Sequence, residues 1–110
     1  MNILSDIKSA LATTGLPVET GVYTGAAKKY IVITPLQERN DDTADDADLT
    51  ETAGADVNLY YDGNYQAVKK QIKTLLKSAG FFIPESRWIE HDKETKQHHY
   101  VITVEKKEVL

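Results

Sequence analysis

The sequence predicts an α+β domain, with an antiparallel sheet of four to five strands and two helices packed on one face. Three observations support this prediction. The chain has 110 residues, which is the usual size of one domain with one core. Two stretches repeat apolar residues at helical spacing, and several short stretches carry strand-type residues between turn signals. The expected element order is α-β-β-loop-β-α-β-β.

The first helix is expected over residues 3–13. Gly15 can take the left-handed conformation that closes a helix, and Pro17 cannot continue one. The helix is short, so we expect packing to stabilise it. Its apolar face consists of Ile3, Leu4, Ile7, Ala10 and Leu11.

Two strand-type stretches follow, at residues 18–23 and 30–34, with residues 24–29 between them. We expect them to form a hairpin. The second stretch, YIVIT, is apolar on both faces, as in a central strand that is covered on both sides or that meets a partner. Pro35 then ends the strand or places a bulge there.

The fold is expected to be organised around a strand, a turn and a helix between residues 56 and 79. The strand 57–61 meets a turn at Asp62 and Gly63, and either Asp62 or Asn64 is placed to cap the helix. A helix joined to a strand in this way folds back onto its sheet. The apolar stripe of the helix consists of Val68, Ile72, Leu75, Leu76 and Ala79.

The last third of the chain predicts two further strands. Gly80 is the expected end of the helix, and the strand-like residues 81–91 are interrupted by Pro84. A polar turn covers residues 92–97. The final strand, residues 98–106, places Tyr100, Ile102 and Val104 on one face and Val101 and Thr103 on the other.

Composition places the chain among soluble globular proteins. Its apolar runs are far shorter than the ~20 residues that span a bilayer, and the N-terminus has no secretory pattern. The chain has no cysteine, which excludes disulfides and thiol nucleophiles. We therefore expect a protein that stays in the cytosol and has no membrane partner. The net charge of −4 argues against direct nucleic-acid binding.

An acidic stretch interrupts the domain. Residues 38–51 hold seven carboxylates and one cation, so we expect a mobile loop or an extended hairpin arm at 37–51 within the single domain 1–110. The arm could be a solvated loop, an ordered contact with a partner or a divalent-cation site. The run lacks the ligand ladder of an EF-hand, so no metal site is assigned.

No catalytic motif occurs in the sequence, so the chain is not expected to be an enzyme or to hold a cofactor. His91, His98 and His99 flank one hairpin turn. Strand alternation lets His91 face His98 but turns His99 to the opposite face, so at most two of them can converge. These histidines are interpreted as exposed hairpin residues, and no metal ligand is assigned.

Two clusters of opposite charge suggest an interface between copies of the chain. Lysines recur every four residues on the second helix, where they are expected opposite its apolar stripe. We call Lys69, Lys73 and Lys77 the lysine row. The row is either a solvated face, a phosphate site or a surface complementary to the acidic arm of a neighbouring copy. The candidate interface residues are Asp41, Asp42, Asp45, Asp46, Asp48, Lys69, Lys73, Lys77, Tyr30 and Val32.

The chain resembles the tail-terminator or tail-to-head joining proteins of tailed phages and prophages. The resemblance is carried by LATTGLPVETGVY, YIVITPL, DVNLYYDGNYQAVKKQIKTLLKSAGF and HYVITVEK, taken in this order. The acidic run falls where members of that family vary. The family has no motif residue that transfers to this chain, so the candidate interface residues rest on charge and pattern alone.

The resemblance implies a structural virion protein that forms a ring, typically six-fold, at the end of the tail tube. Such a ring stops tube polymerisation and joins the tail to the head. Its implied partners are further copies of itself, the tail-tube protein and the head connector, and its implied place is the virion tail, assembled in the bacterial cytoplasm. Two alternatives stay open: a monomeric adaptor that contacts a protein through the acidic loop, and a small enzyme of unknown chemistry.

Overall fold

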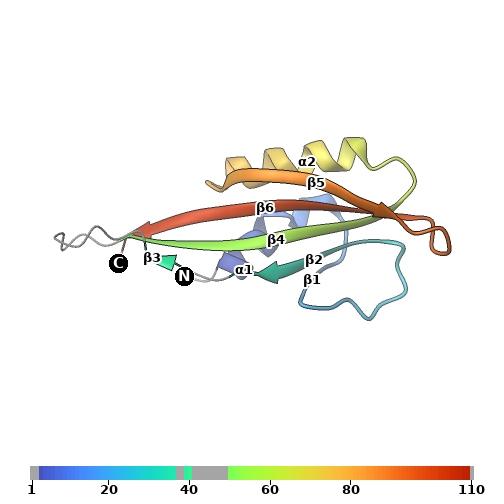
Figure 1. Ribbon diagram of the computed structural model, residues 1–110, viewed down its shortest axis with the longest axis horizontal. Helices are drawn as coiled ribbons and strands as arrows, with labels where there is room; N and C mark the ends of the chain where they lie inside the picture. The colour runs from blue at the N-terminus through green and yellow to red at the C-terminus, as the bar shows by residue number, and fades with distance from the viewer. Residues whose placement is uncertain (1–2, 37–38, 41–49, 110) are drawn as a thin grey trace.

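A computed structural model of the chain describes residues 3–36, 39–40 and 50–109. Its helices and strands form two layers, with the helices on one side of a twisted sheet (Figure 1). In chain order the elements are α1 Ile3–Ala10, a 3₁₀ turn η1 Ala12–Thr14, β1 Val18–Thr20, β2 Lys29–Pro35, β3 Arg39–Asn40, β4 Thr50–Asp62, α2 Gln66–Ser78, β5 Phe82–His91 and β6 Gln97–Val109.

The sheet has the strand order β1-β2-β4-β6-β5, and β3 pairs with β4 beyond the end of β2. This confirms the α+β class. The sheet is mixed, however, because β1 runs parallel to β2 with Val18 opposite Ile31. The hairpin predicted for residues 18–34 is therefore wrong. The chain turns away at Gly21, which has a positive φ, and returns before β2 begins.

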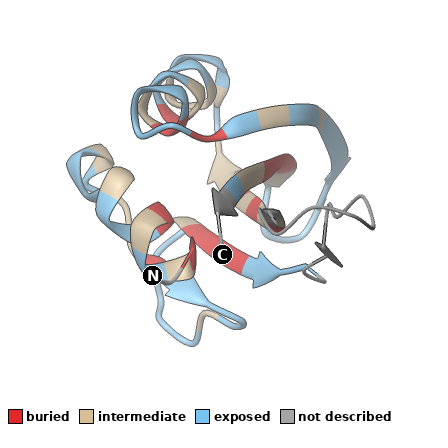
Figure 2. Cartoon of the chain, turned by 90° about the vertical axis from the view of Figure 1, so that its left-hand side faces the viewer, coloured by how far each residue is buried: buried red, intermediate tan, exposed pale blue. Residues whose placement is uncertain are grey.

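Both helices cover the same face of the sheet, as predicted (Figure 2). The expected first helix is α1 followed by η1, and Gly15 closes it in the left-handed conformation with φ 76°. None of the described helices is long and apolar enough to cross a membrane. The core between helices and sheet is formed by Ile3, Ile7, Leu11, Val18, Ile31, Ile33, Ala53, Ala55, Val57, Leu59, Ile72, Leu76, Phe81, Tyr100, Ile102 and Val104.

Strands β4 and β6 are longer than the sequence predicted. They pair without a break from Thr50 opposite Val109 to Asp62 opposite Gln97. Residues 50–56 have little strand pattern of their own, so pairing with β6 on one side imposes the extended conformation. The short β3 pairs Arg39 with Thr52 on the other side.

The predicted turn is confirmed at Gly63, which has φ 100°. The predicted helix cap is not, because the N-cap residue of α2 is Tyr65, which makes no side-chain cap hydrogen bond. Asn64 lies one residue earlier, where its side-chain oxygen Oδ1 accepts a hydrogen bond from the backbone of Gln66 at 3.0 Å. Pro84 does not split β5, because it lies at the register shift between Phe82 and Glu85, in a strand at the edge of the sheet. An edge strand tolerates a proline and a bulge, since its outer backbone groups need no sheet partner.

Candidate functional site

The face of the sheet opposite the helices is uncovered by any described element, and we call it the open face. Its residues alternate along each strand with those that point into the core. The strand register places three cross-strand rows on it. These rows are Tyr30-Tyr60-His99-Glu90, Val32-Asn58-Val101-Arg87 and Thr34-Asp56-Thr103-Glu85.

Four rings stack across the open face in one line, which we call the aromatic ladder: Tyr23, Tyr30, Tyr60 and His99. The ring centroids lie 4.2 Å apart for Tyr23 and Tyr30, 4.9 Å for Tyr30 and Tyr60, and 4.3 Å for Tyr60 and His99. Successive planes are tilted by 22°, 21° and 17°. The hydroxyl of Tyr23 accepts a hydrogen bond from the backbone of Ala27, so the ladder also holds the loop between β1 and β2.

A polar network lies beside the ladder, centred on Asn58. Its amide nitrogen Nδ2 donates to the carbonyl of Val32 at 3.0 Å and to Oγ1 of Thr34 at 3.2 Å. Its oxygen Oδ1 therefore faces Nε2 of His99, 2.9 Å away, and a hydrogen bond between them requires the proton on Nε2, because an amide oxygen only accepts. Partial burial lowers the pKa of His99 and raises the pKa of Tyr60.

A second group of aromatic and basic side chains lies under α2, on the covered face. The Tyr100 hydroxyl donates to Oγ of Ser86 at 3.0 Å, and Nζ of Lys73 lies 3.5 Å from it. Nζ of Lys69 lies 5.1 Å from the centre of the Tyr100 ring. Burial by itself raises the pKa of Tyr100, but the Ser86 hydrogen bond and the two lysine charges outweigh it, so the pKa is lowered.

These contacts correct the expected position of the lysine row. Lys69 and Lys73 are half-buried beside the apolar stripe of α2 and lean over Tyr100, instead of projecting from the opposite side of the helix. Lys77 is exposed. Only Lys77 of the row therefore has the solvated character that the sequence suggested for all three.

The other candidate interface residues differ in accessibility. Tyr30 is half-buried in the ladder, and Val32 is only 8% exposed although it lies on the open face. Val32 therefore offers little surface in the single chain, and the interface role of both residues stays a prediction. The five aspartates Asp41, Asp42, Asp45, Asp46 and Asp48 lie outside the described residues.

The three histidines lie as strand alternation predicts. His91 is opposite His98 with ring centroids 4.6 Å apart, while His99 is on the other face in the aromatic ladder. Nδ1 of His98 accepts a hydrogen bond from the indole nitrogen of Trp88 at 3.1 Å. Within residues 3–36, 39–40 and 50–109, no three His, Cys, Asp or Glu side chains gather as a metal site would require.

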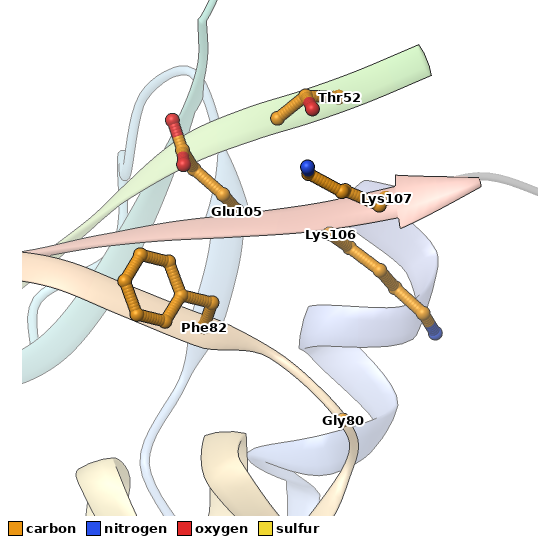
Figure 3. A pocket seen from close by; sticks show the side chains of 6 residues that line it. All are labelled: Thr52, Gly80, Phe82, Glu105, Lys106 and Lys107. Carbon is orange, nitrogen blue, oxygen red and sulfur yellow. The ribbon is translucent and has the colours of Figure 1, made fainter. Parts of the chain in front are cut away.

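A depression of about 340 Å³ lies near the C-terminal end of β6 (Figure 3). No sequence pattern pointed to this depression, because its lining comes from three separate parts of the chain; Phe82 within it is 65% exposed. Lys106 points to the other side of the sheet, where its ammonium lies 3.9 Å from Asp6 of α1. The residues that line the depression are Thr52, Gly80, Phe82, Glu105, Lys106 and Lys107.

Exposed large apolar side chains gather at the edge strand β5. Among the described residues, Phe82, Trp88 and Ile89 of this strand are 65%, 49% and 38% exposed. The remaining two are Val22, at 68%, in the loop after β1, and Leu36, at 40%, after β2. Such residues at the rim of a sheet are typical of a surface that meets another protein.

Comparison with known proteins gives a match in structure alone. No protein-family model matches the chain, and no curated protein matches it in sequence. A chain in the solved structure described as the virion of a native gene transfer agent (GTA) particle superposes with a TM-score of 0.64. The chain shares its fold with a virion protein.

The likeness extends over the whole domain. It covers 98% of this chain and 95% of the virion chain, at 12% sequence identity. At this identity the comparison shows a common fold and carries over no residue role. The expected resemblance to phage proteins is thereby supported at the level of a phage-like virion fold, and the tail-terminator assignment remains a prediction.

Proposed function

We propose that the chain is a non-catalytic structural protein of a phage-like virion. The observation that carries this proposal is the match in fold to a virion chain over nearly the full length of both chains. The exposed apolar side chains at the β5 edge support it further, because a protein that works by assembly needs surfaces that neighbouring subunits cover.

Within the virion, the proposed role is a closed ring, typically of six subunits, at the end of the tail tube. The ring stops tube polymerisation and offers a surface to the head connector. This finer role comes from the sequence resemblance to tail-terminator proteins. One contact between neighbouring subunits, repeated by rotation, closes into such a ring. The proposed function therefore depends on the residues that form this contact.

The proposal is tested by absolute mass from light scattering on a sizing column, over a wide range of protein concentration and at low and high salt. We expect a discrete closed assembly of about six subunits. The chain is then mixed with the tube protein of the same tail module while that protein polymerises. We expect shorter tubes, each with the chain at one end, when seen by electron microscopy.

A chain that stays monomeric at every concentration and leaves tube length unchanged would contradict the ring. A stable one-to-one complex with a single virion or host protein, in that case, would favour the adaptor. Turnover of any substrate by the purified chain would favour the enzyme instead.

A further inference from the structure

The sheet ends in two edge strands that no described strand covers. One edge is β1 and the other is β5, at opposite ends of the strand order. Backbone N–H and C=O groups at the edge of a sheet can pair with a strand of another chain. Glu19 and Thr20 of β1 are exposed, and so are most residues of β5.

The two edges match in length. β5 keeps a regular register with β6 only from Glu85 to Trp88, because register shifts lie on both sides of this stretch. β1 consists of the three residues Val18–Thr20. The three residues of β1 can therefore pair with the regular stretch of β5 in another copy. The register shifts on both sides of that stretch limit longer pairing.

The two edges also match in direction. β1 is parallel to β2, and each later step across the sheet, from β2 to β4, β6 and β5, is antiparallel. β1 and β5 therefore run in opposite directions within one copy. If a second copy is related to the first by rotation about an axis along the strands, its β1 meets β5 as an antiparallel pair.

The side chains fit in one register. Glu19 lies opposite Val32 and Arg87 opposite Val101, so both project from the open face. Pairing Glu19 with Arg87 joins a carboxylate to a guanidinium across the contact. In a single copy the Arg87 guanidinium contacts Glu85 at 3.2 Å, and both side chains are largely exposed.

The same register aligns the covered face. Val18 lies opposite Ile31, and Trp88 lies opposite Tyr100, so both are on the side of the helices. With Glu19 opposite Arg87, Val18 comes opposite Trp88 and Thr20 comes opposite Ser86. The Trp88 ring, 49% exposed in the single chain, gains an apolar neighbour.

We propose that β1 of one copy of this chain adds to β5 of the next, with Glu19 opposite Arg87, so that the sheets of neighbouring subunits join edge to edge. The inference rests on the proposed ring, because a closed ring supplies every β5 with a β1. The contact is heterologous, since two different surfaces of the chain meet in it.

The absence of cysteine from the chain permits a direct test by crosslinking. Residues directly opposite in an antiparallel pair have Cα atoms about 4.5–5.5 Å apart, within the range of a disulfide. Under mild oxidation, the double variant Glu19→Cys with Arg87→Cys should give a covalent ladder that stops at the ring size. Glu19→Cys with Lys93→Cys, which is exposed in the turn before β6, is the matched control and should give none.

Single variants test the heterologous character of the contact. Glu19→Cys alone and Arg87→Cys alone should each stay uncrosslinked, and a mixture of the two should give covalent dimers only. Dimers from Arg87→Cys alone would show that β5 meets β5, which overturns the inference. Circular dichroism of each variant checks that the fold is kept.

Charge reversal gives a second test that needs no disulfide. Glu19→Arg or Arg87→Glu alone should weaken assembly by about two- to fivefold per contact at low salt, and the two together should restore it. A closed assembly that forms without crosslinking and is insensitive to both reversals contradicts the edge contact while leaving the proposed ring in place. A chain that stays monomeric in solution and also in the presence of tail tubes contradicts both the edge contact and the proposed ring.

Discussion

Leu59 and Tyr60 are neighbours in β4, and they stabilise the fold in different ways. Leu59 is fully buried under the helices, as is Ile31 opposite it in β2, and Tyr100 opposite it in β6 is 7% exposed. Tyr60 lies on the open face and is half-buried by the rings on either side of it. One face is protected from water by a second layer, and the other is protected by its own side chains.

The comparison shows how a sheet face that no described helix or strand covers can be stabilised. The covered face gains its stability from apolar surface removed from solvent. The open face keeps its polar atoms paired, with Asn58 at the centre of the network and Oγ1 of Thr103 donating to Asp56 at 2.7 Å. Among the described residues, the exposed large apolar side chains lie mainly at the β5 edge instead of on this face.

The largest effect is expected on the covered face. Leu59→Ala should lower the free energy of unfolding by about 2–5 kcal/mol, because it removes buried methyl groups and leaves a cavity. Urea denaturation measures this. Val22→Ala, at a side chain 68% exposed, is the matched control and should change stability by less than about 0.5 kcal/mol. Equal losses from both variants would mean that the helices do not protect this face as described.

The next effect concerns the polar network of the open face. Asn58→Leu should cost about 1–3 kcal/mol, because the Val32 carbonyl and Nε2 of His99 lose a hydrogen-bond partner. The free energy of unfolding is again measured with urea. A neutral result would show that water replaces Asn58, and that the network contributes little to the stability of this face.

A smaller effect is expected for the stacking itself. A double-mutant cycle with Tyr30→Leu and Tyr60→Leu should give a coupling energy of about 0.5–1.5 kcal/mol, since the two rings stack at 4.9 Å. The pair Tyr60 and Tyr65 is a suitable control and should give additive changes, because Tyr60 lies on the open face whereas Tyr65 contacts Tyr100 on the covered face. If the two stability changes are additive for Tyr30 and Tyr60, the stacked rings stabilise the fold only through the surface that each ring buries.

The smallest effect is expected from pH. Burial lowers the pKa of His99 below the usual 6.5, so the unfolded chain takes up a proton before the folded chain does. Stability is therefore fully present above about pH 6.5, falls as the pH drops through that value, and levels off below the folded pKa. Urea midpoints across this pH range should show the slope.

Two substitutions test whether His99 causes this change of stability with pH. His99→Gln should remove part of it, whereas His91→Gln, at an exposed position on the same hairpin, should leave it in place. If both variants keep the slope of the parent chain, His99 is not its source.

The candidate site was only partly predictable. Tyr30 and the positions of the histidines followed from strand alternation, but the members of the aromatic ladder come from a loop and three different strands. A pattern within one segment does not show which ring of another segment will lie beside it. In the same way, the spacing of Lys69 and Lys73 placed them on one side of α2 but did not reveal Tyr100 beneath them.

Features that depend only on neighbouring residues follow from the sequence: the apolar stripes of both helices, the turn at Gly63, the closure at Gly15 and the alternation along β6. Tertiary structure alone decided the parallel pairing of β1 with β2, the full length of β4 and the free edge at β5. The physical reason is that strand pairing depends on hydrogen bonds between distant segments, and any strand offers the same backbone groups to several partners.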